Sequence, residues 1–227
     1  YGQLSERYAE SVARSAERSF AVISRTLGFA PDNPITILLA ATDEEFREFT
    51  HRAVPDWSAA VAVPGDSIII SPLPGRKVSV DHILAHEIVH VIIDDAAGDT
   101  FVPRWFHEGC AEIFSGELGI SGQLYIVWKA VRNELLTFQD IERLFSARGA
   151  DVSLAYDQSM LAVKQLIEVY GNSALYGTID GLHRGYDFEN AFRTAAGFST
   201  DEFELAHLAA LRRTYGTRAL WTLIPGT

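Results

Sequence analysis

Apolar residues in the first third of the chain change from helical spacing to the short runs typical of strands. Residues 4–27 have apolar side chains at helical spacing, and Gly28 marks the expected end of this helix. Residues 35–39 form a β-branched run bounded by proline and polar residues, which predicts a buried strand. Two more strands are expected at residues 59–63 and 68–70, with a turn sequence between them. The pattern predicts a long first helix followed by a small sheet.

One short helix is expected between the first two strands. Thr42 is followed three residues later by Glu45, which is the sequence of a capping box at the start of a helix. Phe46 and Phe49 then follow at helical spacing. We therefore expect a helix to be inserted into the sheet-forming part of the chain.

After the third strand the pattern is almost entirely helical. Residues 80–95 are apolar on nearly every side and Gly98 ends the stretch, so this helix is expected to be buried in the middle of a domain. Pro103 suits the first position of the next helix, which should run to about Ser115. Further helices are expected at residues 123–131, 138–145, 155–170, 172–181, 187–196 and 201–215. The order predicts an α+β fold, with a small N-terminal sheet and a mainly helical C-terminal part around the buried helix.

Length and composition favour one globular domain. The chain has 227 residues, of which 48% are hydrophobic and 22% are charged. We expect a single domain over residues 1–227, with an N-terminal α/β lobe at about 1–98 and a helical lobe at about 99–227. The one cysteine, Cys110, excludes an internal disulfide and a zinc site built from several cysteines.

The charge balance excludes some classes of partner. With 19 basic and 30 acidic side chains, the formal net charge is −11. A protein that binds nucleic acid by broad neutralisation of phosphates needs clustered Lys and Arg, so we expect no nucleic-acid partner. Docking on anionic lipid is disfavoured for the same reason, and no apolar run is long enough to span a membrane.

The first residue bears on where the protein works. The chain begins at Tyr1 and not at Met. We expect a processed N-terminus, with a targeting segment missing from this sequence, and hence a secreted or otherwise extracytoplasmic protein.

The buried helix carries the main chemical motif, His86-Glu87-Ile88-Val89-His90. The two histidines are spaced i, i+4, so both imidazoles lie on one face of the helix and can reach a single metal ion. Glu87 is rotated away from them by about 100° and can bond a metal-bound water without being a ligand. The alternative is two core histidines and an exposed glutamate. Without partners, such polar groups on a buried helix would be costly.

A third ligand is needed for a catalytic zinc site, and the next helix offers Glu108. It lies 18 residues after His90, which allows the first helix to end and the chain to return antiparallel. Gly109 and Ala111 are expected to let these two helices approach closely. Glu112 lies one turn further on, where it can accept a hydrogen bond from the free imidazole N–H of a ligand histidine. The alternative for the two glutamates is a solvated helix face.

The two segments together have a recognisable form. His86-Glu87-x-x-His90 followed by Trp105-Phe106-x-Glu108-Gly109-x-Ala111-Glu112 resembles the gluzincin zinc metallopeptidases, and among them the peptidase MA-like family. The resemblance implies a zincin-like fold, a peptide or protein substrate, and Zn²⁺ bound by His86, His90 and Glu108. It also implies that Glu87 is the general base and acid. Glu112 stands where gluzincins place a supporting acid, often Asp.

A later helix offers a donor for the oxyanion of the transition state. Residues 155–159, with the sequence A-Y-x-Q-S, begin a stretch that ends in Tyr170-Gly171, and both features resemble the family. Because a metal supplies only part of the stabilisation, a second donor is expected, and Tyr156 is the candidate. His183, in a polar turn, is the alternative donor. Tyr156 would otherwise be a half-buried aromatic residue with its hydroxyl at the surface.

Other polar residues near the motifs have no assigned chemistry. His82 is one turn before the motif and too far along the helix to share its metal ion. His107 points away from the glutamate that follows it, and Cys110 is expected to pack as a small apolar residue. Asp94 and Asp95 end the buried helix with charges that oppose its dipole, for which the sequence gives no reason beyond a supporting or ion-binding role.

These residues predict amide hydrolysis, in which zinc activates a water and Glu87 takes its proton. Residues 68–71 are expected to form an exposed edge strand that pairs with the extended peptide substrate. One alternative is a catalytically silent zinc-containing domain that binds peptides or proteins. Another is a helical interaction domain in which the motif is accidental.

Overall fold

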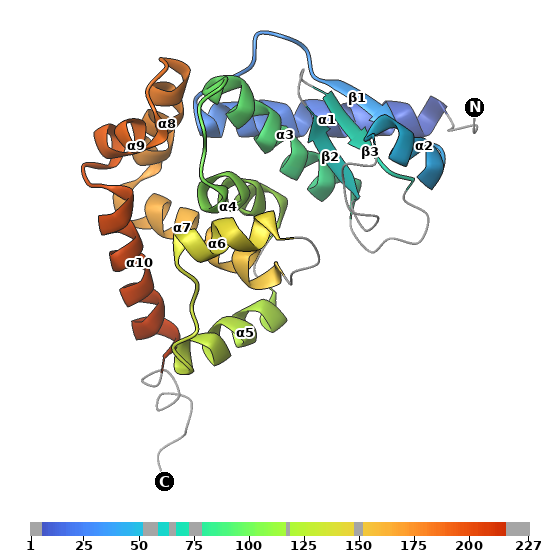
Figure 1. The fold of residues 1–227 in the computed structure, drawn as a ribbon. Helices are drawn as coiled ribbons and strands as arrows, with labels where there is room; N and C mark the ends of the chain where they lie inside the picture. The colour runs from blue at the N-terminus through green and yellow to red at the C-terminus, as the bar shows by residue number, and fades with distance from the viewer. Residues whose placement is uncertain are drawn as a thin grey trace.

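The structure is a computed structural model of the 227-residue chain. It describes residues 6–51, 59–63, 67–72, 79–116, 119–147 and 152–216. These residues form ten helices and one three-stranded sheet, which is the α+β fold expected from the sequence (Figure 1). In these ranges, no helix has both the length and the apolar composition needed to cross a membrane.

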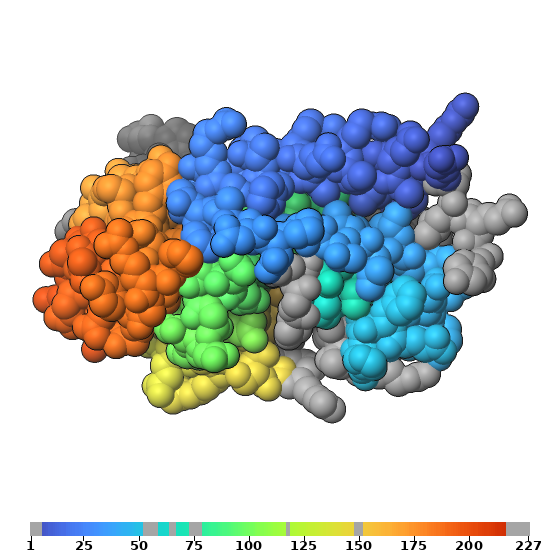
Figure 2. Space-filling view, turned by 90° about the horizontal axis from the view of Figure 1, so that it is seen from above, coloured from blue at the N-terminus to red at the C-terminus, as the bar shows by residue number. Residues whose placement is uncertain are grey.

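The first helix, α1 (Glu6–Leu27), lies along the molecule and contacts helices from both parts of the chain. Its buried face packs on α3 (Val80–Ala97), and it ends at Gly28, whose φ of 71° is left-handed and favours glycine. Seen from above, α1 extends from the region of the sheet to α8 (Asn172–His183) (Figure 2). The helix therefore contacts both the N-terminal and the C-terminal parts of the chain.

The sheet has the strand order β1-β3-β2. Strand β1 (Thr36–Leu39) is parallel to β3 (Ser67–Ile70), and β2 (Ala60–Val63) is antiparallel to it. The expectation that residues 68–71 form an exposed edge is therefore wrong. After α2 (Asp43–Phe49) the chain enters β2 and then reverses into β3, which lies between β1 and β2 and is hydrogen-bonded on both sides. Strand β2 is an outer strand instead, and it contacts α3.

The helix expected from the capping box is α2, although only half of the box has the predicted bonds. Thr42 is its N-cap, and the hydroxyl accepts a hydrogen bond from the backbone N–H of Glu45. The Glu45 carboxylate accepts from the N–H of Ala41 at 2.6 Å, one residue before the cap. The pattern therefore identified the helix start correctly.

Helix α3 is buried and is followed by α4 (Arg104–Ser115), as the pattern predicted. Ser79 caps the start of α3, and Gly98 ends it with a φ of 56°. Pro103 is the N-cap of α4 and not its first helical residue. Because proline offers no capping side chain, Glu142 accepts the hydrogen bond of the first N–H of α4 at 3.0 Å.

The remaining helices lie within three residues of the predicted bounds. They are α5 (Ile120–Val131), α6 (Phe138–Ser146), α7 (Ser153–Tyr170), α8, α9 (Phe188–Ala196) and α10 (Thr200–Tyr215). One core of apolar side chains includes residues of α1, the sheet, α3, α4 and most of the later helices. Trp105 of α4 lies near its centre, stacked on Phe138 with ring centroids 4.2 Å apart.

Gly109 makes a close helix contact, but with a different partner from the one expected. A Cβ at this position would lie 2.3 Å from the backbone oxygen of Ser159 and 2.7 Å from Val163 Cγ2, both on α7. The expected use of Gly109 against α3 is wrong. In a compact molecule α4 has more than one neighbour, and here the glycine faces α7 while Glu108 faces α3.

Candidate metal centre

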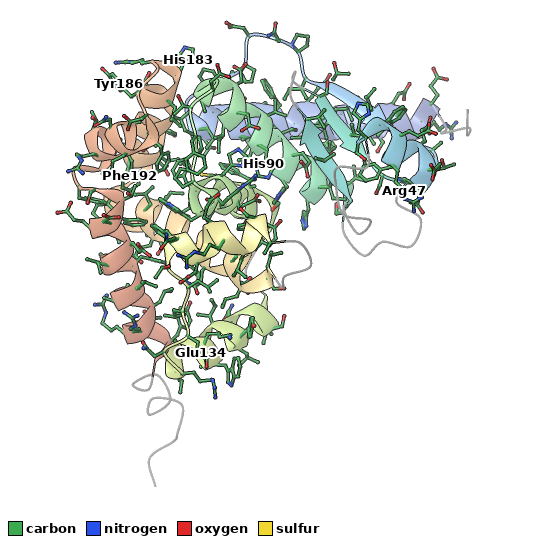
Figure 3. All side chains as sticks on the ribbon, viewed as in Figure 1. Arg47, His90, Glu134, His183, Tyr186 and Phe192 are labelled. Atoms are coloured by element: carbon green, nitrogen blue, oxygen red, sulfur yellow. The ribbon has the colours of Figure 1, made fainter. Side chains whose placement is uncertain are left out.

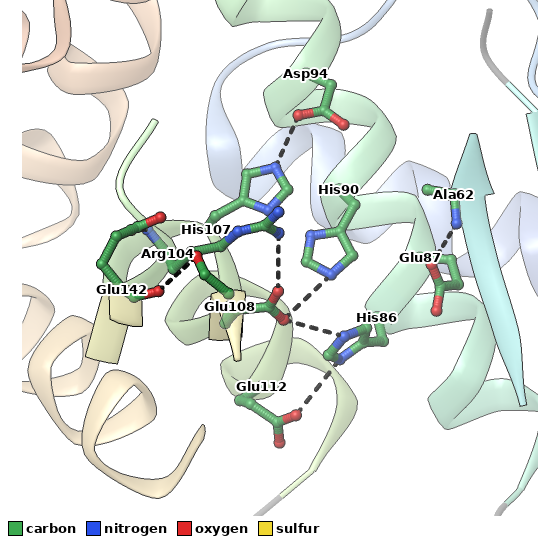
Figure 4. Close-up of polar contacts among 11 residues, drawn as sticks. Ala62, His86, Glu87, His90, Asp94, Arg104, His107, Glu108, Glu112 and Glu142 are labelled. Atoms are coloured by element: carbon green, nitrogen blue, oxygen red, sulfur yellow. Dashed lines mark hydrogen bonds and ion pairs between the residues drawn. The ribbon is translucent and has the colours of Figure 1, made fainter. Parts of the chain in front are cut away.

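Helices α3 and α4 bring three potential ligands together (Figure 4). Nε2 of His86 lies 3.6 Å from Oε2 of Glu108, and Nε2 of His90 lies 3.5 Å from the same oxygen. The ligand atoms are all within 4.8 Å of one another. Around a tetrahedral zinc ion with bonds of about 2.0–2.2 Å, neighbouring ligand atoms lie roughly 3.3–3.6 Å apart. The arrangement is therefore suited to a divalent metal ion.

The surroundings of Glu108 favour one orientation of its carboxylate. Oε2 is buried and has no hydrogen-bond partner among the described residues, whereas Oε1 accepts a bond from Nη1 of Arg104 at 3.4 Å. Arg104 lies one turn before Glu108 on α4, so the two side chains share a face. With Oε1 bonded in this way, Oε2 is directed toward His86 and His90 (Figure 4). The i, i+4 spacing was the sequence signal for this role of Arg104.

His86 has acceptors on the side of its ring away from Glu108. Its Nδ1 lies 3.4 Å from Oγ of Ser115 and 3.5 Å from Oε1 of Glu112. Glu112 thus lies beside a candidate ligand histidine, at the position from which it was expected to support the imidazole. Ser115 was not identified from the sequence, although it lies three residues after Glu112 on the same helix face.

Glu87 is buried, not exposed, and it faces the sheet. Its Oε2 accepts a hydrogen bond of 2.7 Å from the backbone N–H of Ala62 in β2. In Figure 4 its carboxylate lies between β2 and the two histidines of α3. The outer strand of the sheet thus holds the carboxylate next to the candidate metal site without placing it among the ligands.

His107 lies against the ring of His90. The two ring centroids are 4.4 Å apart and the rings are 12° from parallel. Nε2 of His107 lies 2.9 Å from Oδ1 of Asp94, which gives the acidic end of α3 a hydrogen-bonded partner on α4. The sequence showed that His107 points away from Glu108, but it could not show that His107 points toward His90.

The ionisation of the cluster follows from burial and from charge. Burial raises the pKa of Glu87 and lowers that of His90 to about 4. For Glu108 the effect of burial is outweighed by the two histidines, which bring its pKa well below the usual value. For His86 burial is outweighed by the close contact with the Glu108 carboxylate and by the charges of the other neighbouring carboxylates, so its pKa is raised. The geometry therefore holds a carboxylate anion between two imidazoles.

Of the two candidate oxyanion donors, only Tyr156 lies near the three candidate ligands. Its ring centroid is 6.5 Å from that of His86, and its ring packs against Phe145 at 4.8 Å. Burial and the nearby carboxylates raise the pKa of Tyr156, so its hydroxyl keeps its proton. His183 lies at the end of α8 against Phe29, far from His90 (Figure 3).

The remaining histidine and cysteine near the motifs also have defined places. His82 is exposed in the first turn of α3 and is not part of the cluster. Cys110 is fully buried on α4, and burial raises its pKa, as expected for a packing residue that does not react. Within the described residues, the cluster of His86, His90 and Glu108 is the only group that could hold a metal ion.

A comparison with family models identifies the family. The model described as peptidase MA superfamily matches residues 15–212. This chain belongs to the peptidase MA superfamily. The match covers most of this peptidase MA member, from α1 to the last turn of α10, and includes the whole cluster on α3 and α4. No curated protein matches the chain at a significant level.

The family assignment confirms the resemblance of the two motifs to the peptidase MA-like family. It also agrees with the zincin-like α+β fold of this peptidase MA member, in which a small sheet lies beside the helix that carries the motif. The fold and a metal-compatible cluster are thus established together. The reaction depends on the side chains at the site.

Proposed function

We propose that this protein is a zinc-dependent peptidase, with zinc held by His86, His90 and Glu108. The observation that carries the proposal is the spacing of the three ligand atoms, with the Glu87 carboxylate next to them. Two imidazoles and one carboxylate are a ligand set of catalytic zinc sites and leave a coordination position for the reaction. Bound zinc supplies Lewis-acid chemistry, which polarises a carbonyl and lowers the pKa of water.

Glu87 is proposed to move the proton during hydrolysis. Its carboxylate takes a proton from the attacking water as the C–O bond forms, and it delivers this proton to the leaving amine as the C–N bond breaks. The hydrogen bond from the N–H of Ala62 fixes one oxygen, Oε2, and leaves Oε1 for the water. The raised pKa of Glu87 makes it a better base than an exposed glutamate.

Tyr156 and Glu112 are proposed to assist. The protonated hydroxyl of Tyr156 donates a hydrogen bond to the oxygen of the scissile carbonyl as negative charge develops there. Glu112, together with Ser115, holds the ring of His86 in the orientation that directs Nε2 at the ligand position.

The substrate peptide is proposed to lie along β2, the outer strand on the side of the site. The backbone N–H of Ser71 donates to the oxygen of Ala59, and in an antiparallel pair only every second residue is hydrogen-bonded to the neighbouring strand. By this alternation the backbone N–H and C=O of Ala62 point away from β3, toward the outer edge of the sheet. The N–H of Ala62 indeed meets Glu87 and not β3. A peptide added to this edge would pass directly beside the proposed base.

A paired measurement tests the function. Wild type and Glu87→Gln are analysed for zinc and digested with a peptide library, with His82→Ala as a matched control on the same helix. We expect about one zinc per chain in all three proteins, and cleavage by wild type and His82→Ala only. Gln keeps an acceptor for the N–H of Ala62 but cannot take the proton.

Two outcomes contradict the proposal. Cleavage that survives in Glu87→Gln overturns the role of Glu87. Stoichiometric zinc in a folded wild-type protein that cleaves no peptide would favour a zinc-containing domain that only binds peptides or proteins.

A further inference from the structure

The two histidines of the cluster are supported in different ways. Nδ1 of His86 faces the oxygens of Ser115 and Glu112, as is usual for a metal-binding histidine. Nδ1 of His90 is buried, and it has no hydrogen-bond partner among the described residues. A hydrogen bond at Nδ1 therefore does not fix the orientation of the His90 ring, as it does for His86.

His107 covers one face of that ring. The rings of His90 and His107 are nearly parallel, 12° apart in orientation, with centroids 4.4 Å apart. His107 is 8% exposed. Rotation of the His90 ring about its Cβ–Cγ bond would drive its edge into the ring of His107, because close-packed interiors leave no room for it. The stack thus restricts the direction in which Nε2 of His90 points.

Asp94 holds His107 in this position. Its Oδ1 lies 2.9 Å from Nε2 of His107, although its side chain is 67% exposed. Asp94 lies four residues after His90 on α3, so one face of α3 supplies both the ligand and the group that fixes the covering ring. His107 directly precedes Glu108, so the same turn of α4 also carries the third ligand.

We propose that His107, fixed by Asp94, is a positioning residue that orients the His90 imidazole for the metal ion. The proposal rests on the proposed function only in requiring that His86, His90 and Glu108 bind a metal. His107 takes the place of the hydrogen-bonding partner that His86 has and His90 lacks. The bond to Asp94 ties α4 to α3 beside the ligands, and this keeps Glu108 and His90 in register.

The experiment measures zinc affinity by competition with a chelator, on folded full-length variants. His107→Ala removes the ring, and we expect its zinc dissociation constant to rise by roughly 10- to 100-fold, as when other supporting groups of metal ligands are removed. His107→Phe keeps a ring for the stack and should lose less affinity than His107→Ala. Asp94→Ala should also lose less, because the ring remains but is held loosely.

Additional measurements separate positioning from simple packing. The double variant Asp94→Ala/His107→Ala should bind zinc as His107→Ala does, because Asp94 acts through the ring. The absorption spectrum of the cobalt-substituted protein should change in His107→Ala and stay close to that of wild type in His107→Phe. His82→Ala, an exposed histidine on the same helix, should match wild type in affinity and spectrum.

The outcomes distinguish this inference from the proposed function. Wild-type zinc affinity in folded His107→Ala overturns the positioning role and leaves the peptidase proposal standing. Additive losses in the double variant overturn the role of Asp94. Weaker zinc binding by His107→Ala, in a protein whose wild type cleaves no peptide, supports the positioning role and overturns the peptidase. A folded wild type that takes up no zinc overturns both.

Discussion

At the scale of single residues, the cluster combines groups whose ionisation is set by burial and by one another. Burial lowers the pKa of His90 to about 4, while Glu108 and the neighbouring carboxylates raise that of His86 against the effect of burial. Two histidines of the same motif therefore take up protons in different pH ranges. A motif in a sequence shows that both can be ligands, but not that they differ in this way.

The difference predicts how zinc uptake depends on pH. Zinc binds neutral imidazole, so a proton on either histidine competes with it. As the pH falls, His86 protonates first and zinc affinity should fall about tenfold per pH unit. Only near pH 4 should His90 add its own proton and steepen the fall.

Calorimetric titration of the metal-free protein with zinc, in buffers of different ionisation enthalpy, counts the protons released. Between about pH 5 and 6 we expect one proton from the histidines. His86→Ala removes the histidine that takes up a proton first, so this variant should release no histidine proton in this range and should bind zinc weakly. Release of both histidine protons already at pH 6 would contradict the low pKa of His90.

At the scale of elements, the position of α4 is set by packing on two sides. Glu108 faces α3, whereas Gly109 lets the α4 backbone lie against that of Ser159 in α7. Gln158 of α7 makes two hydrogen bonds to the backbone of Leu136, at 2.8 and 3.0 Å, and so fixes the segment that precedes α6. The A-Y-x-Q-S stretch thus has a structural use at Gln158 in addition to the proposed role of Tyr156.

The contact at Gly109 predicts a large effect of one methyl group. A Cβ would lie 2.3 Å from a backbone oxygen, so Gly109→Ala must push α4 and α7 apart. We expect a loss of stability at the upper end of, or above, the roughly 1–3 kcal/mol typical of overpacking. Denaturant unfolding measures the loss, and zinc affinity should fall with it because Glu108 moves.

Gly116 is the matched control on the same helix. It is the C-cap of α4, its φ of −172° is open to any residue, and a Cβ there meets nothing within 4 Å. Gly116→Ala should unfold like wild type. Equal stability of the two alanine variants would contradict the close contact between α4 and α7.

At the scale of the whole molecule, α10, the last described helix, is joined to the core by a buried histidine. His207 of α10 is 1% exposed, lies beside the rings of Phe138 and Phe203, and has Nδ1 2.9 Å from Oε1 of Gln165. Burial lowers its pKa to about 4 from an ordinary value of 6.5. The folded protein therefore favours the neutral ring.

This burial predicts that stability falls on acidification. Between about pH 6.5 and 4 the unfolded chain binds a proton at His207 that the folded chain does not, so the free energy of unfolding decreases as the pH falls through this range. A shift of this size corresponds to up to about 3 kcal/mol. Below pH 4 this residue should cause no further loss.

His207→Phe isolates the effect. Phenylalanine keeps an aromatic ring beside Phe138 and Phe203 but cannot titrate. The difference in unfolding free energy between wild type and His207→Phe, measured in denaturant at several pH values, should move in favour of the variant from pH 7 to pH 4. His90 contributes equally to both proteins and cancels. A difference that does not change with pH would contradict the prediction.

Local patterns were sufficient to predict every helix and strand of the described residues, the fold class and the two motifs. Helical periodicity, caps and glycine stops act within one element, so a sequence displays them directly. The i, i+4 spacing likewise defines which side chains share a face of α3 or α4. These features required no knowledge of which elements are neighbours.

Only the tertiary structure decided which elements meet. Sequence alone left β3 as an edge strand, Gly109 against α3, and His107 without a partner. The structure places β3 in the centre of the sheet, Gly109 against α7, and His107 between Asp94 and His90. Such contacts join residues far apart in the chain and depend on how all elements pack at once. The motif therefore determined which residues could bind a metal, and the packing of α3, α4 and β2 determined which other residues hold them in place.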